Sequence, residues 1–90
     1  MKKAIISVVG QDTVGIIARV CTYLASRQIN VRDISQTIID GYFNMMMIVD
    51  VSDIDDEFND IVQDLDAIGT EIGVKIRCQR EEIFTKMHRL

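Results

Sequence analysis

A polar turn bracketed by glycines, Gly10 to Ile17 with the sequence GQDTVGII, joins an apolar run to an amphipathic segment of helical spacing. Gln11, Asp12 and Thr13 fall just before the first turn of the predicted helix. The first amides of a helix have no partner within it, and together with the helix dipole they form a site for a carboxylate or phosphate. This junction is therefore the candidate site for a small ligand.

The same turn has a simpler interpretation. Asp12 or Thr13 could cap the helix with its side chain. Gly10 and Gly15 would then serve only to let the backbone turn sharply, whereas beside a ligand they would also allow its close approach. Because short motifs match by chance often, the turn alone leaves both interpretations open.

Size, charge and composition exclude several classes of protein. Ninety residues make one small domain, and a hydrophobic fraction of 48% is more than a monomer of this size needs, so we expect contact with a partner chain. The net charge of -4 argues against binding to nucleic acid, which normally requires a basic face. No apolar run resembles a signal peptide or is long enough to cross a membrane. We therefore expect a cytoplasmic protein with no membrane or nucleic-acid partner.

The sequence predicts no metal site, no cofactor and no catalytic centre. Cys21 and Cys78 are far apart in the chain and His88 is the single histidine, so we expect two reduced thiols rather than metal ligands. The run Met45 to Met47 places its middle residue on the opposite face of a strand from its neighbours, which favours packing over copper binding. No nucleophile, base and arginine clamp converge in any motif. The chain is not predicted to be an enzyme.

The hydrophobic periodicity predicts alternating elements without a linker. Strands are expected over residues 4–9, 31–40, 42–51 and 74–80, with a helix over residues 14–28. A second helix should begin at a cap formed by Ser52 or Asp53 and end near Gly69 and Gly73. The dipeptide Asp40-Gly41 predicts a tight hairpin of the primed type.

This order predicts an α+β fold of the ferredoxin-like βαββαβ type, a four-stranded antiparallel sheet with two helices on one face. Residues 1–80 would form the single domain and residues 81–90 a short helical C-terminal tail. The uncovered face would be apolar, and we expect either the tail or a second subunit to cover it, most simply in a twofold homodimer. Its side chains would be Ile5, Val9, Tyr42, Met46 and Ile48.

Three segments together resemble the ACT domain family: GQDTVGIIARV after the first strand, INVRDISQTI at the entry to the second, and the DG hairpin. The resemblance covers residues 3–80, and it rests on the turn with Gly10, Asp12 and Gly15 occurring together with the step Asn30-Val31. The small size is similar to short bacterial and archaeal ACT proteins that stand alone, and to the ACT repeats of a glycine-cleavage transcriptional regulator.

The resemblance implies a regulatory module that binds a small effector, often an amino acid, between two paired domains. Backbone amides would hold the effector carboxylate, and Asp12 or Asn30 would meet its ammonium group or polar side chain. The polar residues of the turn favour a small polar amino acid. By position, the implied effector-binding residues are Gly10, Gln11, Asp12, Thr13, Val14, Gly15, Ile16, Asn30 and Val31.

These ninety residues depart from the usual arrangement in the family because we identify no attached enzyme or DNA-binding domain in them, and this leaves two hypotheses for the output. One hypothesis is a sensor whose ligand-bound dimer contacts a separate enzyme or regulator. The alternative is a constitutive module for protein interaction and oligomerisation that has kept the fold and binds no effector.

Overall fold

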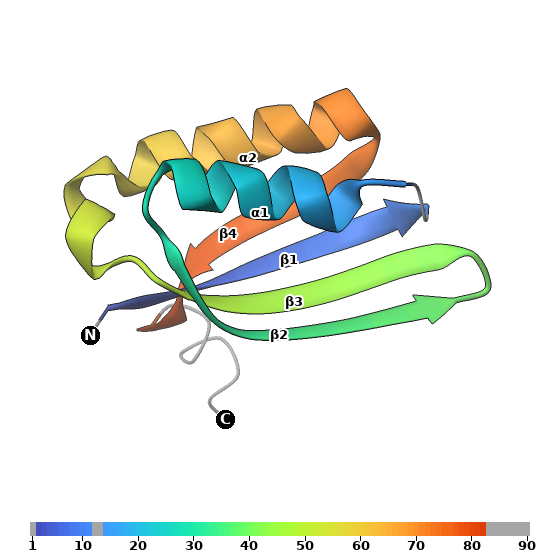
Figure 1. Ribbon diagram of the computed structural model, residues 1–90, viewed down its shortest axis with the longest axis horizontal. Coiled ribbons are helices and arrows are strands. Elements are labelled where there is room, and N and C mark those ends of the chain that lie inside the picture. Colours follow the sequence, from blue (N-terminus) through green and yellow to red (C-terminus); the bar gives the residue numbers. More distant parts are fainter. Residues whose placement is uncertain (1, 12–13, 83–90) are drawn as a thin grey trace.

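The computed structural model describes residues 2–11 and 14–82, which form one antiparallel sheet with two helices on one of its faces (Figure 1). This arrangement confirms the predicted α+β, ferredoxin-like βαββαβ fold. The elements are β1 (Lys3–Gln11), α1 (Ile16–Ser26), β2 (Asn30–Ile39), β3 (Tyr42–Asp50), the 3-10 segment η1 (Ser52–Glu57), α2 (Phe58–Ile72) and β4 (Val74–Arg80).

The strand order β2-β3-β1-β4 makes β1 and β3 central and leaves β2 and β4 as the two edges. β2 and β3 are joined by the predicted hairpin, in which Asp40 and Gly41 have φ angles of 51° and 82°. Positive φ at both central residues is the signature of the primed turn that Asp-Gly favours, so this prediction is confirmed. A bulge between Val31 and Asp33 interrupts the pairing of β2 with β3.

The core lies between the sheet and the helices, and strand alternation determines which side chains enter it. The buried side chains are Phe43, Met45, Met47 and Val49 on β3, and Val74, Ile76 and Cys78 on β4. The helices contribute an apolar stripe at helical spacing. Side chains exposed by 2% or less include Ile6, Val8, Ile16, Val20, Leu24, Met45, Met47, Val49, Ile61 and Leu65.

Both helix starts differ from the prediction. α1 begins at Ile16 rather than at residue 14, because Gly15 takes a left-handed conformation with a φ of 89° and no side chain caps the helix. Neither Ser52 nor Asp53 caps α2, which starts only at Phe58. The intervening segment η1 buries Ile54, whose φ of -125° prevents a continuous α-helix.

β1 is longer than predicted and takes in Gly10 and Gln11, which pair with Phe43 and Tyr42 of β3. Gly10 is therefore not a turn residue. It is required by packing, since a Cβ at this position would lie 2.8 Å from Cγ1 of Val74 on the neighbouring strand. The predicted tail helix lies mostly at residues 83–90, outside the described residues.

Candidate functional site

The first turn of α1 presents backbone amides without partners in the helix. The first bond that reaches back to the turn is donated by the Arg19 amide to the Gly15 carbonyl oxygen, at 2.9 Å. The amides of Ile16, Ile17 and Ala18 precede it and have no partner within the helix. No acidic side chain occupies this turn. The predicted caps Asp12 and Thr13 lie outside the described residues.

A groove of about 490 Å³ runs beside these amides, between α1 and the strands β2 and β3. Gly15 and Ile16 line it, as two members of the predicted effector site. Its other walls were not predicted from the sequence, and they are Ile17, Ala18, Gln36, Ile38 and Phe43. Among the described residues that line the groove, Gln36 is the single polar side chain, so this part of the wall is mainly apolar.

The other predicted site residues that the structure describes do not line this groove. Gly10 and Gln11 belong to β1, and Val14 is fully exposed. Asn30 and Val31 pair with Asp50 and Val49, at the opposite end of the sheet from the turn before α1. Ile39 lies nine residue steps along the strand from Asn30, which is about 30 Å. A single chain therefore keeps the two halves of the predicted site apart.

The groove opens toward β2, and the two sheet edges differ in character. β2 exposes Ile34, Ile38 and Ile39, and its stretch from Ile34 to Ile39 carries no charge. Exposed edge strands are normally protected from pairing by charged residues. The other edge, β4, carries Lys75 and Arg77. β2 is therefore the edge suited to pair with another strand.

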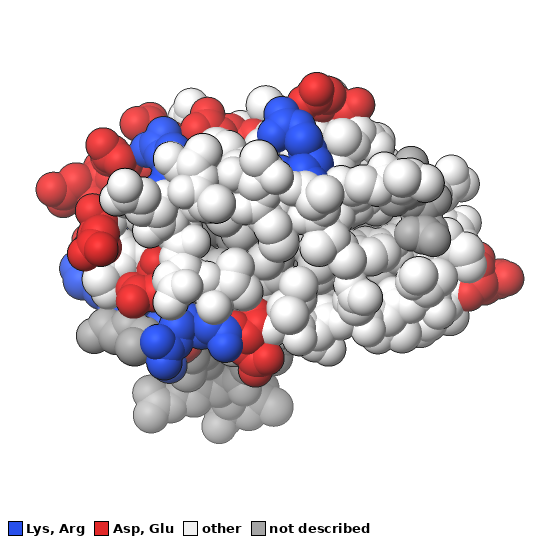
Figure 2. All heavy atoms as spheres, in the orientation of Figure 1, with Lys and Arg blue, Asp and Glu red and all other residues white. Residues whose placement is uncertain are grey.

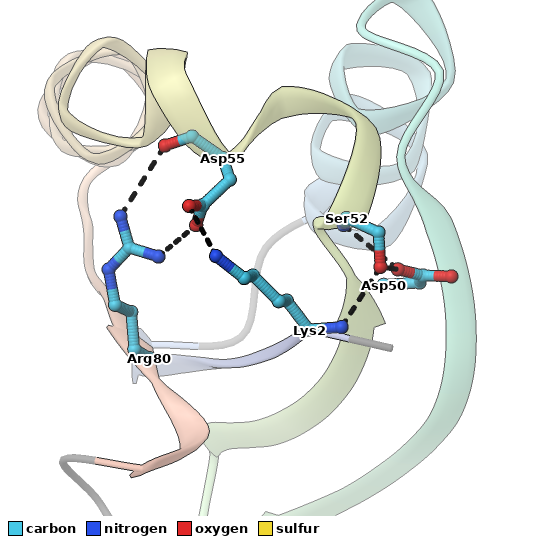
Figure 3. Close-up of polar contacts among 5 residues, drawn as sticks. All are labelled: Lys2, Asp50, Ser52, Asp55 and Arg80. Atoms are coloured by element: carbon cyan, nitrogen blue, oxygen red, sulfur yellow. Dashed lines mark hydrogen bonds and ion pairs between the residues drawn. The ribbon is translucent and has the colours of Figure 1, made fainter.

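Charge is arranged away from the groove. Figure 2 shows a broad area without Lys, Arg, Asp or Glu where Figure 1 places the start of α1 and the adjoining parts of β2 and β3, with acidic atoms at the hairpin end. At the opposite end of the sheet, Asp55 lies between Lys2 and Arg80 (Figure 3). Hydrogen bonds from Arg80, and then from Lys2, hold the pKa of the Asp55 carboxyl below its usual range. Arg80 also stacks on the Phe58 ring at 4.3 Å, so this cluster ties the N-terminus, η1 and β4 together.

The described part of the chain offers little catalytic chemistry. Among residues 2–11 and 14–82, no group of three His, Cys, Asp or Glu side chains could hold a metal ion. Burial raises the pKa of the Cys78 thiol to about 11, so this cysteine stays protonated and unreactive near neutral pH. Within the same residues no helix combines the length and apolar character needed to cross a membrane.

Known proteins with similar sequences match along nearly the whole chain. A UPF0237 protein of Bifidobacterium longum is 71% identical over 100% of both chains. A UPF0237 protein of Listeria innocua is 51% identical over 98% of this chain and 99% of its own. Among archaea, one from Methanocaldococcus jannaschii is 42% identical over 100% of both.

Solved structures and a family model identify the family to which these sequences belong. An ACT domain protein from Streptococcus pneumoniae superposes with a TM-score of 0.82 at 43% identity, covering 92% of this chain and 93% of that one. A proposed glycine cleavage system transcriptional repressor gives a TM-score of 0.78 at 19% identity over 88% of this chain and 45% of its own, which is a likeness of fold. The family model for the ACT domain matches residues 2–79. The chain belongs to the ACT domain family.

Proposed function

We propose that this protein is a regulatory ACT domain that binds an amino acid at the interface between two copies and transmits that binding to a separate protein. Membership of the ACT family supports a regulatory role. The observation that carries the proposal is the groove beside the first turn of α1, because it joins amides that have no partner within the helix to an apolar wall at an edge strand that is open to pairing.

The carboxylate of the effector would bind the amides of Ile16, Ile17 and Ala18, where the helix dipole favours negative charge. Its side chain would lie along Ile38 and Phe43. These walls are apolar, so we now expect an amino acid with an aliphatic side chain rather than the small polar one that the turn residues favoured. Gln36 supplies a polar contact from β2.

A second copy would complete the site. Two β2 strands pairing antiparallel about a twofold axis near their centres place the Asn30 end of one strand next to the Ile39 end of the other. Asn30 and Val31 of one copy would thus approach the groove of its partner. This pairing brings together the two halves of the site that a single chain holds about 30 Å apart.

An effector bound across this interface contacts both copies, so it stabilises the pair relative to the separated chains. A regulated protein that recognises the paired form would then respond to the effector concentration. The effector would act on the regulated protein by shifting the equilibrium between separate and paired chains, and no rearrangement of the fold is needed.

Thermal unfolding of the purified protein with each of the twenty amino acids tests the proposal. A ligand at one hundred times its Kd adds about 2.7 kcal/mol to the unfolding free energy. In a domain of this size this raises Tm by about ten degrees or more. We expect a selective shift from aliphatic amino acids, accompanied by an increase in the dimer fraction on sedimentation. If no amino acid changes either quantity, the constitutive interaction module is the better description.

A further inference from the structure

The sheet face opposite the helices, which we call the open face, has an apolar centre. Val9 on β1 and Tyr42 and Met46 on β3 are exposed by 49%, 56% and 43% on these two central strands. Ile39 continues the apolar surface onto β2 with 64% exposure. Contiguous apolar surface of this kind marks an interaction site in a small domain.

Charged side chains lie at both edges of the open face. Asp33 lies on the β2 edge, where it pairs with Ile48 and shares its face. Lys75 and Arg77 lie on the β4 edge, where they pair with Val9 and Ser7. All three charged side chains are exposed, and none forms an ion pair with another of the described residues.

We infer that the open face binds the open face of a second copy, with β2 of each copy lying over β4 of the other. A twofold axis that runs along the strands between β1 and β3 reverses the order β2-β3-β1-β4 in the partner. The apolar central strands then face each other, and Asp33 on each β2 edge, which also carries the exposed Arg32, faces the β4 edge with its two cations. Two sheets packed in this aligned way lie about 10 Å apart.

The register shows which side chains would meet. One row across the sheet contains Asp33, Ile48, Ile5 and Gln79, and the next contains Ser35, Met46, Ser7 and Arg77. In the partner copy each row runs in the opposite order. Asp33 therefore lies over Gln79 of the partner copy and beside Arg77 of the partner copy. Met46 lies over the small Ser7 in the same arrangement.

A hollow on the open face supports this pairing. It has a volume of about 100 Å³ and is lined by Asp33, Ile34, Ser35, Met46 and Ile48. In the arrangement described, the Arg77 side chain of the second copy lies above this hollow, with the Asp33 carboxylate at its rim. A twofold axis perpendicular to the strands would instead set β4 over β4 and bring Lys75 and Arg77 against like charges.

This interface differs from the one in the proposed function. The effector groove lies on the helix side of the sheet, and pairing of open faces leaves the outer edge of β2 free. Because the two twofold axes do not coincide, use of both interfaces would join pairs into a larger assembly.

Charge reversal with rescue tests the inference on the full chain by sedimentation equilibrium. Asp33→Arg and Arg77→Asp should each weaken association by at least about tenfold, and the double variant Asp33→Arg/Arg77→Asp should restore it. Met46→Lys should weaken association similarly by placing a charge at the apolar centre. Asp66→Arg on the exposed face of α2 is the matched control and should leave association unchanged.

Several results would overturn the inference. A wild-type chain that stays monomeric at every concentration has no such interface, and a double variant as weak as the single reversals rules out β2 over β4. Association that is unchanged by Met46→Lys places the contact elsewhere. Pairing that appears only after deletion of residues 83–90 would assign the open face to that segment in the intact chain.

Discussion

The hydroxyl of Tyr23 on α1 donates a hydrogen bond to the Asp64 carboxylate on α2, at 2.5 Å. Arg27, one turn further along α1, approaches the same carboxylate at 3.8 Å and also bonds Glu57 at 2.9 Å. The two helices are thus joined by a polar cluster outside the apolar core. Because α1 forms one wall of the groove, this cluster helps to hold that wall in place.

Replacing Tyr23 with Phe removes the hydroxyl and keeps the ring. Hydrogen bonds to charged groups contribute about 1.5–3 kcal/mol, and the partly exposed position places this one near the lower value. We expect the unfolding free energy to fall by about 1–2 kcal/mol, measured by urea denaturation. Tyr42→Phe, at the exposed tyrosine, is the control, and an equal loss in both variants would contradict the assigned role of the Tyr23 hydroxyl.

The same contact predicts a difference at alkaline pH. Burial, and then the hydrogen bond to Asp64, raise the pKa of Tyr23 above its ordinary value. A group whose pKa is raised by folding stabilises the folded state fully below the unfolded pKa, which is about 10 for tyrosine, and loses this contribution above it. The unfolding free energy should therefore decline above about pH 10, and the decline should be smaller in Tyr23→Phe.

Asp55→Asn should change the response to acid. The Asp55 pKa is lowered in the folded state by hydrogen bonds from Arg80 and Lys2. Its stabilising contribution is therefore present above the unfolded pKa of about 3.9 and is lost as the pH falls through the folded value. The wild type should lose stability more steeply below about pH 4 than Asp55→Asn does, in a series of denaturation curves. Asp56→Asn, at a neighbouring exposed carboxylate, should follow the wild type.

Gly10→Ala should destabilise the fold although it adds only a methyl group to a strand. The new Cβ would lie 2.8 Å from Cγ1 and 3.0 Å from Cβ of Val74, so β1 and β4 must separate locally. Overpacking of this kind costs about 1–3 kcal/mol. Val74→Ala removes the nearer atom, so the cost of Gly10→Ala should be smaller in that background. An equal cost in both backgrounds would exclude the contact as the cause.

Local patterns predicted most of the fold. Alternation on β3 and β4 identified the buried side chains because a strand has one face toward the helices, and Asp40-Gly41 fixed the hairpin through backbone geometry. The late start of α2 was missed because it depends on Ile54 reaching the core, which no capping residue reveals. The close approach of Val74 to Gly10 joins distant parts of the chain and leaves no local signal.

The candidate site was also predicted only in part, because it too depends on contacts between distant parts of the chain. Gly15 and Ile16 were found because they adjoin a glycine turn at a helix start. Ile38 and Phe43 were not predicted as site residues, because nothing in their local sequence distinguishes them from other strand residues. They line the groove because β2 extends beyond the part of the sheet that α1 covers. An exposed isoleucine on the helix side of an edge strand is the sequence and structural feature that could have indicated this wall.

A charge in the groove should abolish effector binding without unfolding the protein. Gln36→Glu places a carboxylate on the β2 wall of the same groove whose α1 amides are expected to hold the effector carboxylate, so like-charge repulsion should weaken binding. Thr37→Glu adds the same charge at the next residue, which points to the opposite face of β2. We expect loss of the effector-induced Tm shift in the first variant and its retention in the second. Loss in both would mean that the charge acts on the strand as a whole.

Mixing two inactive variants tests whether each site is built from two copies. Val31→Ala shortens a side chain that pairs with the buried Val49 on the helix side of β2 and is expected to reach the partner's groove, whereas Gln36→Glu blocks the groove of its own chain. In a mixed pair, one site receives both changes and the other receives neither, because the twofold interface exchanges the two contributions. Equimolar mixing of the two chains should therefore restore about one quarter of the sites, measured by calorimetric titration with the effector. Recovery of binding on mixing requires a shared site, whereas a site held within one chain would stay inactive in every mixture.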